Sequence, residues 1–156
     1  MAEDFGRRIP YLLRRVNGEL SQRLDEDLRE FGLTQSQLSA LAILALEHPK
    51  GLSGATLSAR SGVTPQSMSA AIAGLVDRDL IRRSPHPTHG RILECTITPA
   101  GIDVVEKVQE ATRDSDRYSG GLDEAQQATL RDLLTRMMHT LDLHLPASAD
   151  APTPER

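Results

Sequence analysis

Apolar residues near the start of the chain recur every three or four positions, the spacing of one face of an α-helix. They are Ile9, Leu12, Leu13, Val16, Leu20, Leu24, Leu28 and Phe31. With Gly32 placed to end the segment, this stripe predicts a helix of ~6 turns over about residues 5–31. A stripe of this length needs a long apolar partner, which either the core or a second subunit would supply.

Two further long stripes lie in the C-terminal half. A Thr-Pro helix-start signal precedes the first, predicted over residues 99–118, and a Gly-Gly pair ends it. Asp123 is placed to cap a last helix, predicted over 123–145. The apolar positions of the two helices are Ile102, Val105, Val108, Leu130, Leu133, Leu134, Met137, Met138, Leu141 and Leu145. The tail, 147–156, is rich in Pro, Ala and Ser, and we expect it to be disordered.

Between these long helices, within residues 34–97, the pattern predicts short helices that each begin at an N-cap. Thr34, with Gln37 three residues later, forms a capping-box pattern ahead of a helix over 35–47. Ser53 is placed to cap a helix over 54–61.

A tight turn joins that helix to the next. Gly62 supplies a positive φ angle at low cost, and Thr64-Pro65 opens the following helix, with Thr as N-cap and Pro at the first position. The predicted inward residues are Met68, Ala71, Ile72, Leu75 and Val76. A short helix, a turn and a second helix form the arrangement that reaches into a DNA major groove.

The outer face of this second helix favours base readout over a plain solvated surface, which is the alternative. It carries Gln66, Ser67, Ser69, Ala70 and Ala73, where a solvated helix would carry Glu and Lys. Short side chains let a helix lie deep in a groove, and Ser and Gln both donate and accept hydrogen bonds to base edges.

A basic β-hairpin is predicted directly after this helix. Residues 81–84 read as extended, 85–90 as a tip of Pro, His, Thr and Gly, and 91–97 as an alternating strand. A hairpin joined to a recognition helix is a wing, whose cations would lie against phosphates or in the minor groove. Its cations are Arg82, Arg83 and Arg91.

Composition agrees with a helical DNA-binding protein and limits its setting. Aromatic residues make up only 3%, so the core must be aliphatic. The net charge of −4 is unevenly spread, because residues 52–97 hold five Arg against three acidic residues. No run reaches the ~20 apolar residues of a membrane span, no signal peptide is evident, and one cysteine suits a reducing compartment. We therefore expect a cytoplasmic protein without membrane contact.

The chain resembles the MarR family (multiple antibiotic resistance regulators), which are winged helix-turn-helix repressors. The resemblance covers roughly residues 11–145 and depends on the order and spacing of several short phrases. They are Leu33-Thr34-x-x-Gln37, Gly62-Val63-Thr64-Pro65-Gln66-Ser67, Leu75-Val76-Asp77-Arg78-Asp79-Leu80-Ile81 and Ile97-Thr98-Pro99-Ala100-Gly101.

The resemblance implies a mainly α fold, in which a winged helix-turn-helix lobe is joined to long dimerisation helices. It implies a homodimer that binds double-stranded DNA at a pseudo-palindromic operator. It also implies release by a small, phenolic or anionic, ligand. The alternatives are a regulator that acts without a ligand and a winged-helix module that binds a protein instead of DNA.

The wing departs from the usual family pattern. Where many members have an acidic residue, any residue and Arg, this chain has His89-Gly90-Arg91, and His86 replaces the Asp of a Pro-Asp-Pro. An Arg common on the recognition helix is Ala70, and a usual buried Leu before the turn is Ser61. Fewer charged contacts predict weaker, or more salt-tolerant, DNA binding.

The predicted sites follow from these assignments. Base readout is assigned to Thr64, Gln66, Ser67, Met68 and Ser69. Phosphate and wing contacts are assigned to Gln37, Ser53, Arg60, Ser61, Arg83, His89 and Arg91. A pocket for an anionic aromatic ligand is assigned to Tyr11, Arg14 and Arg15.

The remaining candidate chemistry is sparse. His86 and His89 fit a solvated wing tip better than a metal site, and Cys95 fits a buried small residue better than a redox sensor. The sequence has no phosphate loop, nucleophile elbow or metal-ligand spacing, so we predict neither an enzyme nor a cofactor.

Overall fold

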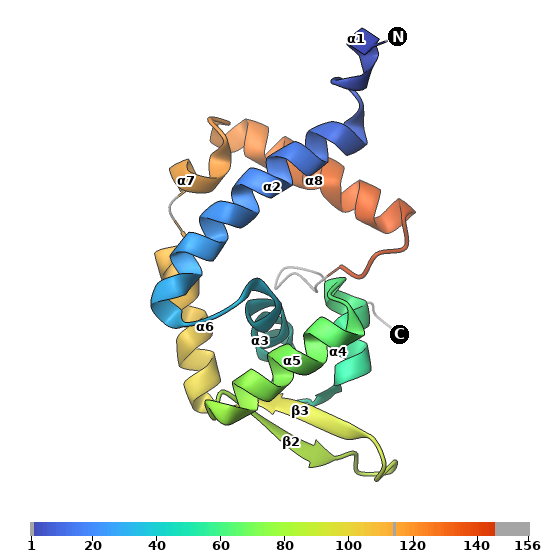
Figure 1. The fold of residues 1–156 in the computed structure, drawn as a ribbon, viewed down its shortest axis with the longest axis vertical. Helices are drawn as coiled ribbons and strands as arrows, with labels where there is room; N and C mark the ends of the chain where they lie inside the picture. The colour runs from blue at the N-terminus through green and yellow to red at the C-terminus, as the bar shows by residue number, and fades with distance from the viewer. Residues whose placement is uncertain (1, 114, 146–156) are drawn as a thin grey trace, which may run out of the picture.

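The computed structural model describes residues 2–113 and 115–145. An arm of helices lies above a lobe that carries a small sheet, and α6 (Pro99–Ala111) runs from the sheet toward the arm (Figure 1). The arm consists of α1 (Ala2–Phe5), α2 (Ile9–Leu28) with a 3-10 turn η1 (Arg29–Phe31), α7 (Ser115–Ser119) and α8 (Glu124–Thr140). The lobe consists of α3 (Gln35–Glu47), β1 (Leu52–Ser53), α4 (Gly54–Ser61), α5 (Pro65–Asp77), β2 (Ile81–Pro85) and β3 (Leu93–Ile97).

The mainly helical fold with a wing is confirmed, and local signals set its helix starts. The Thr34 hydroxyl forms a complete capping box with the glutamine three residues later, and the Asp123 carboxylate does the same. The Ser53, Thr64 and Thr98 side chains each accept a backbone N–H from the first turn of the helix that they precede. Each predicted N-cap therefore satisfies a backbone donor that the helix leaves unpaired.

The core lies in the lobe and not in the arm. Fully buried side chains come from α3, α4, α5 and the sheet, with additions from α6 and the end of α2. They include Leu28, Leu41, Leu44, Leu57, Met68, Leu75, Ile81, Cys95 and Val108. Within its described length, α8 contributes no buried residue. The lobe is thus a packed unit, while the apolar stripe of the last helix is only partly covered within the described chain.

The sheet is antiparallel with strand order β1-β3-β2, and the sequence did not predict β1. Ile81 pairs with Ile97 in the wing, and Leu52 of β1 pairs with Cys95. The prediction that the second wing strand begins at Arg91 was wrong, because β3 starts at Leu93 and Arg91 lies in the tip. The His86 N–H donates to the Ile92 carbonyl at 2.8 Å and closes that tip.

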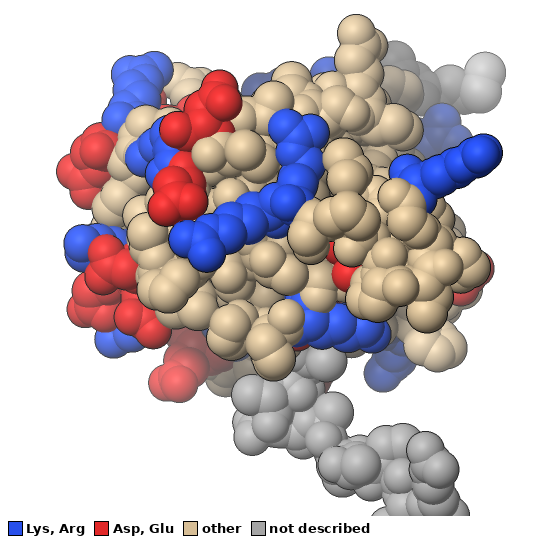
Figure 2. Space-filling model, turned by 90° about the horizontal axis from the view of Figure 1, so that it is seen from below, with Lys and Arg blue, Asp and Glu red and all other residues tan. Residues whose placement is uncertain are grey.

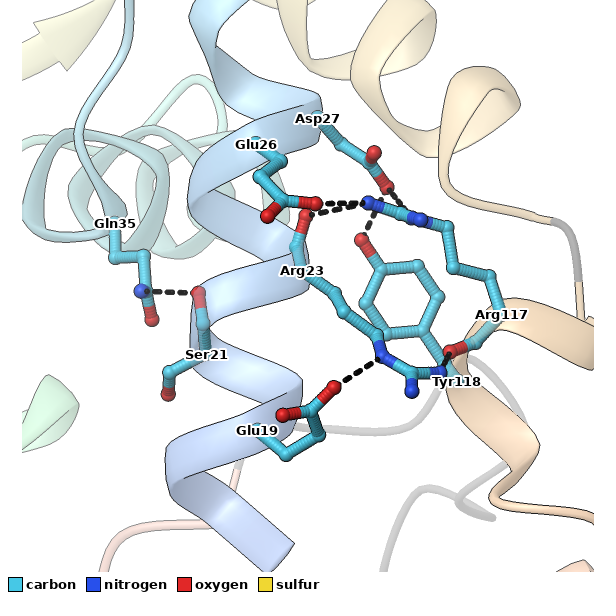
Figure 3. Close-up of polar contacts among 8 residues, drawn as sticks. All are labelled: Glu19, Ser21, Arg23, Glu26, Asp27, Gln35, Arg117 and Tyr118. Carbon is cyan, nitrogen blue, oxygen red and sulfur yellow. Dashed lines mark hydrogen bonds and ion pairs between the residues drawn. The ribbon is translucent and has the colours of Figure 1, made fainter.

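The helix predicted over residues 99–118 is two helices. The first, α6, ends at Ala111, and α7 turns so that Arg117 and Tyr118 reach α2 (Figure 3). Arg117 Nε donates to Asp27 Oδ2 at 3.0 Å, and the Tyr118 hydroxyl donates to the same carboxylate oxygen. These contacts fix the direction of α7, and the spacing of apolar residues alone does not predict this change of direction after α6.

The other long helices are shorter than predicted. At the start, α1 is separate from α2, and the 3-10 turn η1 completes the segment before Gly32 takes a φ of 61°. At the end, α8 stops at Thr140 instead of residue 145, and Asp142 has a φ of 54° that interrupts the helix. The tail predicted to be disordered, 147–156, lies outside the described residues.

Candidate nucleic-acid interface

The helix-turn-helix consists of α4, the turn at Gly62 and α5. Gly62 has a φ of 73°, the left-handed conformation that the turn requires. The Ser58 hydroxyl donates to the Val63 carbonyl at 2.6 Å. The Ser61 hydroxyl donates to the Leu57 carbonyl at 2.7 Å and accepts the Val63 N–H at 3.2 Å. Ser61, predicted to hold a phosphate, is thus engaged in fixing the turn.

The exposed face of α5 is uncharged over residues 65–73, as predicted, and the exposed Asp77 lies at the C-terminal end of the helix. Gln66, Ser67 and Ser69 are exposed on it, and Thr64 caps its first turn by accepting the Ser67 N–H. The assignment of Met68 to base readout was wrong, since this side chain is only 1% exposed. Its place in the 3.6-residue period turns it into the lobe core, where it supports the reading face from behind.

The wing presents two exposed arginines with no charged partner. Arg83 lies on β2 opposite Cys95, and Arg91 lies in the tip. In the described part of the chain, neither guanidinium makes an ion pair or a side-chain hydrogen bond. His89 is also exposed at the tip, and its ring centroid lies 5.2 Å from that of His86. The unpaired arginines of the lobe that are available for phosphate contact are therefore at the wing.

The other lobe arginines are occupied. Arg60 Nη1 donates to Glu47 Oε1 at 2.8 Å, and Arg82 lies 3.7 Å from Asp79. Arg78, at the C-terminal end of α5, donates to the carbonyls of Phe31 and Gly32, each at 2.9 Å. Arg78 was not assigned a role by the sequence, because its two partners lie more than forty positions earlier.

The two remaining predicted phosphate contacts are also helix caps. Gln37 Oε1 accepts the Thr34 N–H at 3.0 Å, and its amide nitrogen lies against Gly74 of α5. The Ser53 hydroxyl accepts the Thr56 N–H at 3.1 Å. Both side chains thus have structural partners in the free protein.

Figure 2 shows Lys and Arg side chains across the middle and right of the underside of the molecule, while most Asp and Glu side chains lie toward the left edge, with further Lys and Arg side chains among them. A phosphate backbone would therefore be attracted most strongly to the middle and right of this face.

A small cavity of about 360 Å³ lies at the N-terminal end of α2. Phe5, Arg8, Pro10, Tyr11 and Arg14 line it. The Tyr11 hydroxyl accepts a hydrogen bond from Arg15 at 3.2 Å, although Arg15 itself is not among the lining residues. An aromatic ring beside two arginines is suited to an anionic aromatic molecule.

A larger open groove, of about 720 Å³, was not anticipated. It lies between α4 and the segment 142–145, and Ala59, Arg60 and His144 are among its lining residues. Its two sides are far apart in the sequence, so no local sequence pattern predicts the groove.

Cys95 is the buried residue that the sequence predicted. It is 2% exposed in the middle of β3, and burial raises the pKa of its thiol despite the nearby Arg83. A protonated buried thiol is a poor nucleophile. Across residues 2–113 and 115–145, no three His, Cys, Asp or Glu side chains are grouped to hold a metal ion. Within the same residues, no helix has the length and apolar character needed to cross a membrane.

This fold, with a capped polar helix beside a cationic wing, defines a winged helix-turn-helix DNA-binding protein. Residues 31–92 match the sequence model described as the MarR family. The HTH-type transcriptional repressor Rv2887 of Mycobacterium tuberculosis is 30% identical over 83% of this chain and 92% of its own length. The chain therefore belongs to the MarR family of transcriptional regulators, and its class of function is that of a transcriptional repressor.

Solved structures agree with this assignment. A MarR-family regulator from Silicibacter pomeroyi superposes with a TM-score of 0.74 and 28% identity, covering 92% of this chain and 97% of that one. Rv2887 in complex with salicylic acid superposes with a TM-score of 0.68 and 29% identity, covering 83% of this chain and 96% of that one.

Proposed function

We propose that this repressor acts as a homodimer, that it binds a pseudo-palindromic operator, and that a small anionic aromatic ligand releases it. The observation that carries the DNA-binding role is the pairing of an exposed, uncharged α5 face with unpaired wing arginines. Gln66, Ser67 and Ser69, with Thr64, read base edges in the major groove. Arg91 and Arg83 contact phosphates or the minor groove from the wing, with His89 beside them.

The remaining phosphate contacts belong to the lobe. Gln37, Ser53, Arg60 and Ser61 lie on or beside the helix-turn-helix, and each has an intramolecular partner. Their contacts with phosphate would therefore exchange one hydrogen bond for another, so each contributes less affinity than an unpaired wing arginine.

Unpartnered apolar surface on the arm supports the homodimer. Val16 of α2 is 56% exposed, and Leu133 of α8 is 50% exposed. Ile9, Leu12, Leu13, Leu130 and Leu141 are likewise exposed. Apolar stripes of this extent on two long helices are expected to be buried by a partner. In a dimer, the two α5 helices would then lie about 34 Å apart, one turn of duplex.

The cavity at the start of α2 supports the ligand proposal. Tyr11 and Arg14 line it, and Arg15 holds the Tyr11 hydroxyl. The relative Rv2887 has been solved with salicylic acid, a molecule with both a phenol and a carboxylate. An arginine would pair with such a carboxylate while Tyr11 contacts the ring.

Separate substitutions test base and phosphate contacts. An operator is first selected from a random duplex pool, and binding is then measured by fluorescence anisotropy at several salt concentrations. Arg91→Ala should weaken binding to all sequences and reduce the slope of log affinity against log salt by about 1. Gln66→Ala should change the selected sequence and leave that slope unchanged. An unchanged motif for Gln66→Ala would contradict base readout by Gln66.

The dimer and the ligand need their own measurements. Leu133→Asp should shift the protein to monomer in sedimentation, while Asp132→Asn on the same helix should not. Salicylate, used as the probe, should release the wild-type protein from DNA and fail to release Arg14→Ala. Equal release of both proteins would show that Arg14 does not bind the ligand.

A second candidate, a lobe that binds a protein, is favoured by one observation. Arg60, Arg78 and Arg82 are already paired, which leaves few cations for DNA. A mobility-shift assay at low salt separates the two functions, because an intact dimer that fails to bind any duplex would support the protein partner.

A further inference from the structure

The tip of the wing is a closed turn and not a loose loop. Beyond the last paired residues of the sheet, Pro85 and Leu93, the His86 N–H donates to the Ile92 carbonyl at 2.8 Å. The Ile92 N–H in turn donates to the His89 carbonyl at 2.8 Å. Arg91 lies between these two fixed points, so the path of the turn decides where its side chain can reach.

The His86 side chain holds this turn from the inside. Its Nδ1 accepts the N–H of Thr88 at 3.1 Å and the N–H of His89 at 3.2 Å. The Thr88 hydroxyl oxygen lies 3.1 Å from the same nitrogen. Asp and Asn side chains organise turns in the same way, by accepting backbone N–H groups two or three residues on.

These contacts indicate the tautomer of the ring. A nitrogen that accepts two N–H groups carries no proton, so the single proton of a neutral ring lies on Nε2. Nε2 faces Glu94 Oε1 of β3 at 3.3 Å. The Glu94 side chain packs over Gly51, since its other carboxylate oxygen lies 3.0 Å from where a Cβ of Gly51 would stand.

We propose that His86 is a positioning residue for DNA binding, because its neutral ring, oriented by Glu94, holds the turn that presents Arg91 to the DNA. This inference rests on the proposed contact of Arg91 with the operator. His86 does not touch the DNA backbone in this role, and it acts only through the shape of the tip. Glu94 and the His89 ring are the titratable groups that face it.

A double-mutant cycle in the full-length protein tests whether His86 acts through Arg91. Operator affinity is measured for the wild type, His86→Ala, Arg91→Ala and the double variant. His86→Ala should weaken binding about three- to tenfold in the wild-type background, as expected for the loss of the turn's hydrogen bonds. In the Arg91→Ala background it should cause no further loss. Equal losses in both backgrounds, or no loss in either, would overturn the proposal.

Two further measurements separate positioning from folding. His86→Asn should recover most of the lost affinity, because the Asn oxygen can accept the same two N–H groups. A long-range ¹H–¹⁵N correlation spectrum should show the proton of the wild-type His86 ring on Nε2, and a proton on Nδ1 would overturn the proposal.

The cycle also separates this inference from the proposed function. If Arg91→Ala alone leaves both affinity and salt dependence unchanged, the DNA contact of the wing is wrong, whatever His86 does. If Arg91→Ala weakens binding and His86→Ala adds to it independently, the wing contact stands and the role of His86 fails.

Discussion

Arg117 and Asp27, ninety positions apart, form an ion pair of 3.0 Å that joins α7 to α2 (Figure 3). Arg117 also donates to Glu26 at 2.9 Å, and Arg23 donates to the Arg117 carbonyl at 2.8 Å. The Tyr118 hydroxyl donates to the Asp27 carboxylate. This α2–α7 cluster sets the direction of the chain between the lobe and the last helix of the arm.

Tyr118→Phe should lower the free energy of unfolding by about 1 kcal/mol, because one hydrogen bond to a half-buried carboxylate is lost. Burial, followed by the hydrogen bond to Asp27, raises the pKa of Tyr118, so the hydroxyl keeps its proton at neutral pH. Urea unfolding provides the measurement. Tyr11→Phe is the matched control, because the Tyr11 hydroxyl has only an exposed contact with Arg15. Equal losses for both variants would show that the Asp27 contact adds nothing.

Asp27→Asn should make the free energy of unfolding less dependent on pH in the acidic range. The hydrogen bond from Tyr118, and then the contact with Arg117, lower the pKa of Asp27 against the opposing effect of burial. A lowered folded-state pKa stabilises the fold above the unfolded pKa of about 4, and this contribution is lost as pH falls through the folded value. The stability gap between wild type and variant should therefore be constant from about pH 5 to 8 and shrink below about pH 4. An unchanged gap at about pH 3 would contradict the charge role of Asp27.

Gly101→Ala should destabilise the join between the lobe and α6. A Cβ at this position would lie 2.2 Å from the Leu80 carbonyl oxygen and 2.7 Å from an Ile97 carbon. Relieving that overlap must shift backbone, at a cost of about 1–3 kcal/mol. Gly18→Ala is the control, because no atom lies within 4 Å of its Cβ position and the substitution removes a helix-interior glycine. Thermal melting should show a lower midpoint for Gly101→Ala only.

Features determined by neighbours in sequence were predictable. Thr34 and Gln37 form their capping box across three positions, and Gly62 turns the chain whatever lies around it. The polar face of α5 follows from the helical period. The same period correctly predicted Met68 as an inward residue, and its second assignment, to base readout, was wrong.

Features determined by distant contacts were not predictable. The two-residue strand β1 is too short for an alternating pattern and exists because Leu52 pairs with Cys95. The break after α6 depends on the contact between Arg117 and Asp27, which are far apart in the sequence. The small number of unpaired arginines in the lobe likewise depends on distant contacts. The sequence shows that Arg60 is a cation, but it does not show that the Glu47 carboxylate lies beside it.

Arg78 should control the spacing at which the proposed dimer reads DNA. Its guanidinium joins the end of α5 to the Phe31 and Gly32 carbonyls, where the segment continuing from α2 ends. A charged donor on carbonyls at a helix C-terminus is favourable and directional, so it fixes the recognition helix relative to the arm. Without it, α5 should adopt a wider range of positions within the dimer.

Arg78→Ala should therefore lose discrimination between the selected operator and versions with one base pair inserted or removed between half-sites. We expect affinity for the selected operator to fall by about tenfold, as for a lost charge-assisted bond, with little change for the altered spacings. Arg78→Lys should recover only part, because a single ammonium cannot reproduce the paired donors of the guanidinium. Arg82→Ala is the control, since Arg82 does not donate to the Phe31 or Gly32 carbonyl and its loss should not change the spacing preference. If Arg78→Ala weakened binding to all three spacings equally, it would act on stability alone and not on the placement of α5.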